Sequence, residues 1–478
     1  MDQNRMPLVE ALQQFREEAP AYFRIPGHRF ERGLDETLNG ASLAAYDLSE
    51  AEGLDDLHHA EGVIAEAQKL AAETWKAKKT FFLVNGTTCG NEAMVLSSVK
   101  EGEKIIVPRN VHKSVLMGLI LSGATPVYVM PEYSTKWQMW GGVTPETIEK
   151  AFAETPDAKA VLLVSPTYYG LCSDLQAIAE ICHCHNAALL VDEAHGSHLY
   201  FSEQLPLGAL ESGADACAQS IHKTAGSFTQ SSFLSLGSGR LDEARVAANL
   251  QMVQSTSPSY LLMASLDAAR RGMALHGKER MERALELGQR ARQELAKIKG
   301  IEALGTEMEG TCGVWKIDPT RLVFSARELG ISGYDLQVRL YEEYRVSTEL
   351  ADEENVVCVI TWANSEEDIT RLIDALAGIS AAESGKTTGR LFRSLPEMVK
   401  TPREAYFAEK EAVPFAEAEG RIAAEMAAPY PPGIPLICPG ERYSREMLEL
   451  MRQYKADGCE FHGPSDASLE VLYVLKEE

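Results

Sequence analysis

The sequence lacks any apolar run long enough to span a bilayer. Its start, Met1-Asp-Gln-Asn-Arg5, also lacks the basic-then-apolar pattern of a signal peptide. Its nine cysteines are an odd number without a visible disulfide framework, as is typical of a reducing compartment. Basic residues are scarce, because 46 Lys and Arg face 70 Asp and Glu and leave a net charge of −24. Such a charge argues against binding nucleic acid or an anionic membrane; it would mildly attract cationic substrates, or serve solubility alone. These features predict a cytoplasmic globular protein.

One cysteine-rich run, Cys182-His-Cys-His185, has the composition of a metal site. It lies at the end of residues 175–185, where apolar residues recur at helical spacing. Side chains at positions i and i+2 of a helix point in different directions, so the run does not favour a shared metal ion. We therefore predict no metal site.

Short apolar runs alternate with helical patterns through residues 61–299. Strands separated by helices indicate a largely parallel sheet covered on both faces, so the predicted fold class is α/β. A long helical region is predicted over residues 258–298. The predicted strands of a seven-stranded sheet are Thr80–Val84, Lys104–Val107, Thr125–Met130, Ala160–Ser165, Ala187–Asp192, Ala214–Ala218 and Ser232–Leu236.

Composition divides the chain into four parts. Residues 1–60 are too irregular for a core element, and they are predicted to be an arm, either a plain strap or a segment that completes a neighbouring subunit. Residues 61–299 form the large domain, and residues 300–377 alternate strands with helices as a smaller α+β unit. Residues 378–478 hold the C-terminal domain, preceded by a linker rich in Gly, Ser and Thr at 377–390.

A lysine and an aspartate at two predicted strand ends carry the first chemical signal. Lys223 lies in Ser220-Ile-His-Lys-Thr224, and Asp192 ends the apolar run 187–191. A carboxylate ending such a run is costly unless it is paired or faces a ligand. Pyridoxal phosphate (PLP) needs this combination, because a lysine forms a Schiff base with its aldehyde and an aspartate keeps its pyridine nitrogen protonated. Lys223 is therefore predicted to carry PLP rather than to be an ordinary solvated lysine.

Other strand ends supply further candidates. The turn Asn85-Gly-Thr-Thr88 opens a helical run, where amide and hydroxyl groups can hold a phosphate, although such turns are common in loops. His112 follows the second strand, where it either stacks on a cofactor or caps a helix. Thr167 and Tyr168 follow the fourth strand at the same edge, and Tyr168 either packs or contacts the cofactor. His195 would orient Asp192 or contact the cofactor.

Together these motifs resemble the ornithine/lysine/arginine decarboxylase family, PLP enzymes of the aspartate-aminotransferase fold. The resemblance covers nearly the whole chain. It rests on Pro26-Gly-His28, Gly53-Leu-Asp-Asp-Leu-His58, Asn85-Gly-Thr-Thr88, Arg109-Asn-Val-His-Lys113, Asp192-Glu-Ala-His-Gly196, Ser220-Ile-His-Lys-Thr224, Gln254-Ser-Thr-Ser-Pro-Ser-Tyr260 and Pro429-Tyr-Pro-Pro-Gly-Ile-Pro435.

The resemblance implies α-decarboxylation of a basic amino acid, with arginine favoured, giving agmatine, and lysine or ornithine as the other candidates. It implies Lys223, Asp192 and His112 as catalytic residues, with His112 over the cofactor ring. The segment at Thr256 is similar to one that reaches a neighbouring subunit's phosphate, so at least a homodimer is expected. The predicted cofactor contacts are Gly86, Thr87, Thr88, His112, Thr167, Asp192, His195, Ser220, His222, Lys223 and Thr256.

The side chain of a basic substrate needs an acidic partner, and Glu425 and Glu441, on either side of residues 429–435, are predicted to provide it. The sequence shows no N-terminal wing such as the large family members carry, so it resembles the shorter form. Two residues depart from the family pattern. Arg29 stands where lysine often follows Pro-Gly-His, and His195 stands where some large members have tryptophan.

Two other functions stay open at this point. An aminotransferase or a lyase of the same fold would use the same lysine and aspartate. A transaminase would also need an arginine clamp for the substrate's α-carboxylate, which the sequence does not reveal. A family member that binds PLP without turnover would instead act as a regulator.

Overall fold

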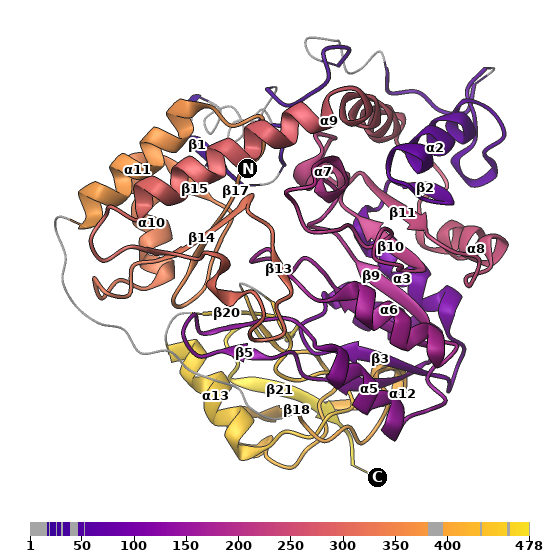
Figure 1. Ribbon diagram of the computed structural model, residues 1–478. Helices are drawn as coiled ribbons and strands as arrows, with labels where there is room; N and C mark the ends of the chain where they lie inside the picture. The colour runs from indigo at the N-terminus through magenta and orange to yellow at the C-terminus, as the bar shows by residue number, and fades with distance from the viewer. Residues whose placement is uncertain are drawn as a thin grey trace, which may run out of the picture.

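The chain forms a large α/β domain, a smaller α+β domain and a C-terminal domain (Figure 1). None of the helices in the part of the chain that the structure describes is long and apolar enough to cross a membrane. The computed structural model describes residues 17–18, 20–24, 26–29, 32–38, 46–51, 53–380, 395–430, 433–456 and 459–477.

The large domain is built on a seven-stranded sheet with the order β2-β11-β10-β9-β7-β3-β4. Strand β11 is antiparallel to both of its neighbours, and the other pairs are parallel. The prediction of a mostly parallel seven-stranded sheet is therefore confirmed. The strands are β2 (Lys79–Leu83), β3 (Lys104–Pro108), β4 (Thr125–Val129), β7 (Ala160–Val164), β9 (Ala188–Asp192), β10 (Ala216–Gln219) and β11 (Ser232–Leu236).

Helices cover both faces of this sheet. Successive residues of a strand point to opposite faces, so Leu190 of β9 packs with α3, α4 and α8, whereas Leu189 packs with α5 and α6. Because both faces are buried, the central strands are continuous apolar runs. The helices of this domain are α2 (Val63–Thr74), α3 (Gly86–Ser98), α4 (Lys113–Ser122), α5 (Pro145–Glu154), α6 (Leu175–Cys184), α7 (Ile221–Thr224) and α8 (Glu243–Val253). Its short elements are η2 (Leu57–His59), η3 (Leu199–Phe201), β5 (Tyr133–Ser134), β6 (Met139–Trp140) and β8 (Leu171–Cys172).

The smaller domain has a four-stranded antiparallel sheet with the order β12-β14-β17-β16. Helices α10 (Gly333–Tyr344) and α11 (Glu366–Ser380) pack on it. Part of the N-terminal arm joins this domain, because β1 (Ala21–Phe23) pairs in parallel with β15 (Val346–Thr348). The remaining strands and short helix are β12 (Glu302–Ala303), β13 (Lys316–Ile317), β14 (Arg321–Ser325), β16 (Leu350–Ala351), β17 (Val356–Val359) and η4 (Thr306–Met308).

Helix α9 (Tyr260–Leu295), 36 residues long, passes from the large to the smaller domain. Met273 and Met281 pack in a core with the large domain, whereas Leu287 and Leu295 pack in the core of the smaller domain. The change of domain therefore lies inside α9, whereas the sequence interpretation places it after residue 299. A continuous helix shows no shift in composition where its buried face changes partners.

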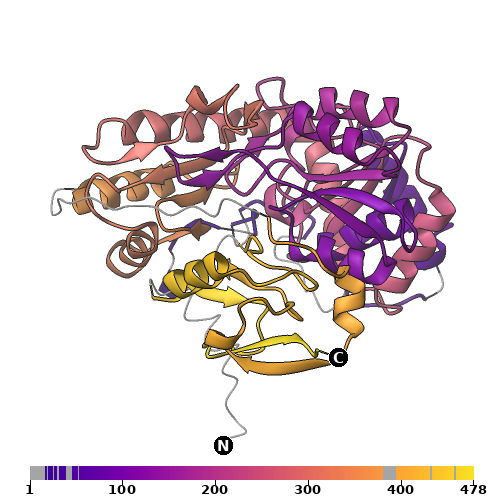
Figure 2. The same cartoon turned by 90° about the horizontal axis from the view of Figure 1, so that it is seen from below.

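The C-terminal domain lies against both other domains, below them in Figure 1 and in yellow and orange in Figure 2. Its core gathers around α13 (Arg445–Ala456). Residues 377–380 of the predicted linker continue α11, and 381–390 lie outside the described residues. The other elements are α12 (Pro402–Phe407), η5 (Phe415–Glu417), and the antiparallel pairs β18 (Lys410–Pro414) with β21 (Val471–Leu475) and β19 (Ala428–Tyr430) with β20 (Glu460–His462).

A buried ion pair fastens the C-terminal domain to the large one. Arg109, which follows β3, donates two hydrogen bonds of 2.7 Å to the two carboxylate oxygens of Glu441. Both side chains are almost fully buried. Arg109 also donates to the carbonyls of Pro435 (2.9 Å) and Leu436 (3.0 Å). The guanidinium therefore holds the segment before Leu436 against the carboxyl edge of the sheet.

We expect Glu441→Gln to lower the free energy of unfolding by about 3–5 kcal/mol, because Arg109 would become a buried charge without a charged partner. The double variant Arg109→Met/Glu441→Leu should lose less stability than the sum of the losses in the single variants Arg109→Met and Glu441→Leu, because it leaves neither charge unpaired. Urea unfolding of the full chain measures both. Glu449→Gln is the control. Glu449 forms an exposed ion pair with Arg445, so its loss should change the free energy of unfolding by less than about 0.5 kcal/mol. Strictly additive losses at 109 and 441 would contradict the coupling.

Candidate active site

A cavity of about 240 Å³ lies where the carboxyl ends of β3, β7, β9 and β10 meet. This edge of an open α/β sheet is the usual place for a ligand. Residues from the C-terminal domain complete its wall. The cavity is lined by Gly86, Thr87, Thr88, Asn91, Asn110, Val111, His112, Trp140, Val164, Thr167, Tyr168, Tyr169, Asp192, Ala194, His195, Ser220, His222, Lys223, Gly433 and Ile434.

Asp192 is held by hydrogen bonds from helix α3 and from the turn that follows β9. Its Oδ2 accepts from Nδ2 of Asn91 (2.7 Å), and its Oδ1 accepts from the backbone N–H of Ala194 (3.1 Å). Nδ2 of Asn91 also donates to Oγ of Ser114 (2.9 Å), which contacts Nδ1 of His112 at 2.8 Å. Asp192 is only 3% exposed, so these donors stabilise a carboxylate that would otherwise be costly to bury.

His112 both caps a helix and lines the cavity. Its Nδ1 accepts from the backbone N–H of Ser114 at 3.2 Å and caps α4. A neutral His112 therefore carries its proton on Nε2, the nitrogen that the cap does not use. The cavity walls withhold water and lower the pKa of His112; Asp192 opposes this effect and Lys223 adds to it. The two interpretations of this histidine, cap and cavity residue, are compatible.

Lys223 lies on the single turn of α7. Its Nζ is 2.8 Å from Nε2 of His195 and 5.5 Å from the centre of the Tyr168 ring. Burial lowers the pKa of Lys223 to about 8, although Asp192 attracts its charge. A lysine with a lowered pKa is more often a free amine near neutral pH, and a free amine is the form that attacks an aldehyde.

Hydroxyl groups gather at the N-terminus of α3. This helix begins at Gly86, whose φ of +74° is strained for other residues. Thr87 Oγ1 contacts Oγ of Ser220 and, at 3.1 Å, Oγ of Ser232. His222 contacts a backbone carbonyl through Nδ1 at 2.9 Å, and burial lowers the pKa of His222 to about 4. Backbone N–H groups and hydroxyls at a helix N-terminus suit a phosphate group.

The motif Pro26-Gly-His28 packs directly behind Lys223. A Cβ added to Gly27 would lie 2.3 Å from the carbonyl oxygen of Lys223, so this close approach requires glycine. The N–H of Gly27 donates to the carbonyl of His222 (2.9 Å), and its own carbonyl accepts from Thr361 Oγ1 (3.0 Å). The N-terminal segment and the smaller domain therefore both brace the turn that carries the lysine.

Of the two residues that depart from the family pattern, one lies away from the cavity and the other lines it. Arg29 is fully buried but does not line the cavity; it donates to Asn364 Oδ1 at 3.1 Å and to the carbonyl of Val359. It therefore bears on how the arm docks on the smaller domain. His195 lines the cavity, and its ring lies 4.3 Å from the ring of Tyr168, centre to centre.

Ten of the eleven predicted cofactor contacts line this one cavity. The exception is Thr256, which is exposed between α8 and α9. The preceding residue, Ser255, accepts a contact of 2.8 Å from His58 Nε2 through its carbonyl. Within a single chain, Thr256 is not part of the cavity wall.

The structure does not bring Glu425 or Glu441 to the cavity, which corrects the prediction that they contact the substrate. Both oxygens of Glu441 are bonded to Arg109, so the residue is an anchor. Glu425 accepts from Ser465 at 2.8 Å and lies 3.7 Å from Lys410 in the C-terminal domain. Both glutamates flank the Pro-rich segment in sequence, but among the described residues of that segment Gly433 and Ile434 are the ones that line the cavity.

Sequence reasoning missed the residues that orient the predicted ones. Asn91 lies one turn into α3, and its spacing of four from Thr87 was the available signal, because residues four apart share a helix face. Trp140 and Ile434 also line the cavity. They come from a two-residue strand and a Pro-rich loop, where no periodicity indicates direction.

The donor set fits PLP. A buried aspartate faces the cavity, a lysine of lowered pKa reaches it, and hydroxyls with a glycine-started helix form a cradle that a Cβ at residue 86 would strain. These are the partners that a pyridine nitrogen, an aldehyde and a phosphate require. Fold and cavity together define a PLP-dependent enzyme of the aspartate-aminotransferase fold.

Comparisons with known proteins specify the family. Residues 6–368 match the model "Orn/Lys/Arg decarboxylase, major domain", and residues 385–464 match the model "Orn/Lys/Arg decarboxylase, C-terminal domain". An arginine decarboxylase of Halalkalibacterium halodurans is 40% identical over 99% of this chain and 98% of its own length. One from Bacillus subtilis is 40% identical over 100% and 99%. The structure of lysine decarboxylase A from Pseudomonas aeruginosa superposes with a TM-score of 0.78 at 22% identity, covering 98% of this chain and 76% of that one.

The chain belongs to the Orn/Lys/Arg decarboxylase family, and it is an amino acid decarboxylase that uses PLP. The predicted family, fold and cofactor are confirmed. The two full-length relatives described above are named arginine decarboxylase, and neither is named an aminotransferase.

We expect Asn91→Leu to weaken PLP binding by about 10- to 150-fold, because a hydrogen bond to a buried charged group is worth roughly 1.5–3 kcal/mol. Equilibrium titration of the cofactor-free chain with PLP, followed by absorbance, measures the effect. Asn249→Leu is the matched control, because that side chain donates to Ser97 on the same helix α3 and does not line the cavity. Equal affinity in the Asn91 variant and the wild type would show that Asp192 needs no orienting donor.

Proposed function

We propose that the enzyme decarboxylates arginine at Cα, giving agmatine and carbon dioxide. The observation that carries this proposal is the single cavity that contains Lys223, Asp192 and the hydroxyl cradle. The full-length relatives at 40% identity that are named arginine decarboxylase support the choice of substrate. The net charge of −24 favours a cationic substrate over an acidic one.

Bound PLP supplies an electron sink for the electron pair left at Cα when carbon dioxide departs. Asp192, oriented by Asn91, holds the proton on the pyridine nitrogen. Thr87, Ser220 and the N-terminus of α3 bind the phosphate. Lys223 would hold the cofactor through Nζ at its aldehyde carbon, and the amine of the substrate would take the place of Nζ there.

The proton that replaces carbon dioxide at Cα must come from a group inside the cavity. Nζ of Lys223 and Nε2 of His112 are the two candidates, because Nδ1 of His112 is committed to Ser114. Trp140, Tyr168 and Ile434 line the cavity and would limit the access of water, so that a positioned group would supply the proton at Cα.

We propose that the guanidinium of the substrate lies in a second, adjoining cavity of about 90 Å³. The two cavities share Asn110, Trp140, Tyr169 and Ile434 in their walls. Aromatic faces and carboxylates are the groups that bind a guanidinium. The wall of the second cavity includes Tyr133, Trp140, Tyr334, Asp352, Glu353, Glu354 and Tyr454.

One of these acids, Asp352, accepts hydrogen bonds from its neighbours. Its Oδ2 accepts from the hydroxyl of Tyr169 at 2.6 Å, and its Oδ1 accepts from the backbone N–H groups of Glu354 and Asn355. Asp352 therefore fixes the turn that presents Glu353 and Glu354. Glu354 is 2% exposed and is the residue we propose as the main partner of the guanidinium.

Purified holoenzyme incubated with arginine, lysine and ornithine should release carbon dioxide and amine fastest with arginine. Glu354→Gln should raise KM for arginine by at least about 10-fold, because a charge-assisted hydrogen bond is lost. Glu425→Gln should leave KM unchanged. If the cofactor binds to Lys223 and none of the three amino acids loses carbon dioxide, the proposed function is wrong. A raised KM in the Glu425 variant would restore the residue to the substrate site.

We also propose that the active form is a homodimer in which Thr256 of each chain reaches the phosphate in the other subunit. The exposed position of Thr256, on a segment next to the start of α3, supports this arrangement: the N–H of Ser255 lies 3.4 Å from Asn85 Oδ1. Thr256 does not line the cavity of its own chain, so a role in that cavity cannot explain why the motif includes it.

Mixing two inactive variants tests the shared site. Co-expressed Lys223→Ala and Thr256→Asp chains should regain about one quarter of wild-type activity. Half of randomly mixed dimers combine both chains, and each of these has one intact site. Each variant alone should stay inactive, and light scattering should report a dimer for both. No recovery in mixed dimers would place Thr256 outside the partner's site.

A further inference from the structure

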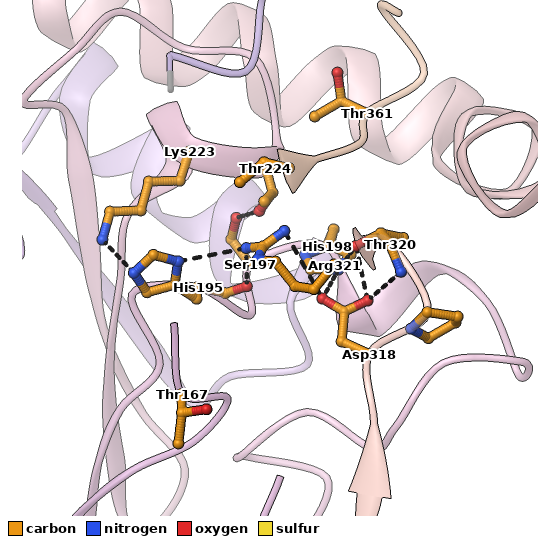
Figure 3. Close-up of polar contacts among 12 residues, drawn as sticks. Thr167, His195, Ser197, His198, Lys223, Thr224, Asp318, Thr320, Arg321 and Thr361 are labelled. Carbon is orange, nitrogen blue, oxygen red and sulfur yellow. Dashed lines mark hydrogen bonds and ion pairs between the residues drawn. The ribbon is translucent and has the colours of Figure 1, made fainter. Parts of the chain in front are cut away.

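A fully buried arginine lies behind His195, on the side away from the cavity. Arg321 begins β14 in the smaller domain and is 0% exposed, but it does not line the cavity. Figure 3 shows its guanidinium between the ring of His195 and the carboxylate of Asp318, with Lys223 on the opposite side of the ring. The row Lys223–His195–Arg321 therefore connects the large domain to the smaller one.

In the part of the chain that the structure describes, the charge of Arg321 has only a long ion pair, with Asp318. The distance from its Nη1 to Oδ2 of Asp318 is 3.9 Å. The same oxygen lies 3.0 Å from Nε2 of His198, and Oδ1 of Asp318 accepts from Thr320 Oγ1 at 2.7 Å. Among the described residues, Nε and Nη1 of Arg321 have no hydrogen-bond partner. Arg109, equally buried, has a two-pronged partner in Glu441. Burying a cation in this way is expensive and indicates a role beyond packing.

The hydrogen bonds that Arg321 donates from its side chain go to His195. Its Nη2 donates to the carbonyl of His195 at 3.0 Å and contacts Nδ1 of the same residue at 3.4 Å. Gly170 makes room for the arginine stem, because a Cβ there would lie 2.7 Å from both Cβ and Cγ of Arg321. The local sequence is therefore adapted to bring this guanidinium to this histidine.

These contacts fix which nitrogen of His195 carries the proton. A guanidinium can only donate, so Nδ1 of His195 must accept. The proton of the neutral ring is then on Nε2, which points at Nζ of Lys223 at 2.8 Å. Burial, with Lys223 and Arg321 nearby, holds the pKa of His195 well below its usual range, so the ring is neutral. An N–H that points at Nζ is satisfied by a neutral amine and opposed by an ammonium group.

We propose that Arg321 is a positioning residue that fixes the tautomer of His195, so that Nε2–H donates to Lys223 and keeps its displaced amino group neutral. Once Nζ has given Cα any proton that it carried, or His112 has supplied that proton instead, the lone pair of Nζ would stay available to bond again to the cofactor's aldehyde carbon when product leaves. This role deepens the proposed function, and it rests on that function only for the identity of the amine that displaces Lys223.

The charged groups around Lys223 favour either its ammonium form or its neutral form. Asp192 and Glu349 favour the ammonium form, and Arg321 disfavours it. The carboxylates lie in the large and smaller domains respectively, so the balance depends on how the two domains meet. Removal of Arg321 leaves the two carboxylates without this opposing charge and lets His195 turn its Nε2 lone pair toward an ammonium.

The rate at which the full chain, stripped of cofactor, recombines with PLP tests the proposal. This rate follows the neutral fraction of Lys223 and is monitored by absorbance across a pH series. In Arg321→Met the pH midpoint of recombination should rise by about half to one unit, which slows the rate at pH 7 by roughly 3- to 10-fold. No substrate is present, so failure of this test and failure to decarboxylate arginine are distinguishable.

A second background separates positioning from simple charge. In a His195→Phe chain, adding Arg321→Met should move the midpoint by less than about a third of its effect in the wild type, because the residue acts through the histidine. Equal shifts in both backgrounds would show that Arg321 acts only as a distant charge and would overturn the proposal. So would an unchanged midpoint in Arg321→Met.

Two further variants keep the test decisive. Arg292→Met is the matched control, since that guanidinium donates to the carbonyls of Pro319 and Arg321 but does not reach His195; it should lower thermal stability without moving the midpoint. If Arg321→Met does not fold, Arg321→Lys takes its place. A shorter ammonium keeps the charge but cannot contact both Nδ1 and the carbonyl, so the midpoint should rise by a smaller amount, and no rise would overturn the proposal.

Discussion

The burial of one carboxylate, that of Asp192, is the constraint around which this enzyme is built. It ends a strand whose residues are buried on both faces, and it faces the cavity at 3% exposure. A charge in that place is tolerable only with donors in fixed positions. Asn91 supplies one of them from helix α3, the helix whose first turn also forms the hydroxyl cradle. The requirement of a single carboxylate therefore fixes the depth and direction of a helix, and with it the other end of the cofactor site.

The lysine side of the site is assembled from parts that are far apart in sequence. Gly27 from the N-terminal segment supports the backbone of Lys223, and Arg321 from the smaller domain contacts His195. Ile434 from the C-terminal domain lines the cavity, and the ion pair of Arg109 with Glu441 anchors the segment next to it. All three domains thus contribute to the site, although its reactive residues, Lys223 and Asp192, both belong to the large domain. Such an arrangement makes the reactivity of the lysine depend on how the domains pack together.

The sequence predicts most of the large domain because its strands are buried on both faces and therefore stand out as apolar runs bounded by turns. The same logic finds Asp192, which interrupts such a run, and Lys223, which follows one. It fails for residues whose role depends on a distant partner. Glu441 and Arg109 are separated by 332 positions, and nothing local distinguishes an acid that meets an arginine from one that meets a substrate. Arg321 begins an ordinary strand, and only the fold places it against His195.

The distribution of positive charge explains how a cavity with so many basic groups can accept a cationic substrate. Lys223 and three histidines line it, together with one buried aspartate. If all of them were protonated, they would repel arginine. Burial lowers the pKa of Lys223 to about 8 and that of His222 to about 4, and it lowers the pKa of His195 and of His112 as well. Near neutral pH the histidines are therefore uncharged, and the permanent cation, Arg321, does not line the cavity.

Arg321 can fix the tautomer of His195 from behind the cavity wall without contacting the substrate. An arginine placed in the cavity itself would hold an α-carboxylate firmly and oppose its departure as carbon dioxide, so the position of the Arg321 guanidinium behind His195, outside the cavity, favours both substrate binding and decarboxylation.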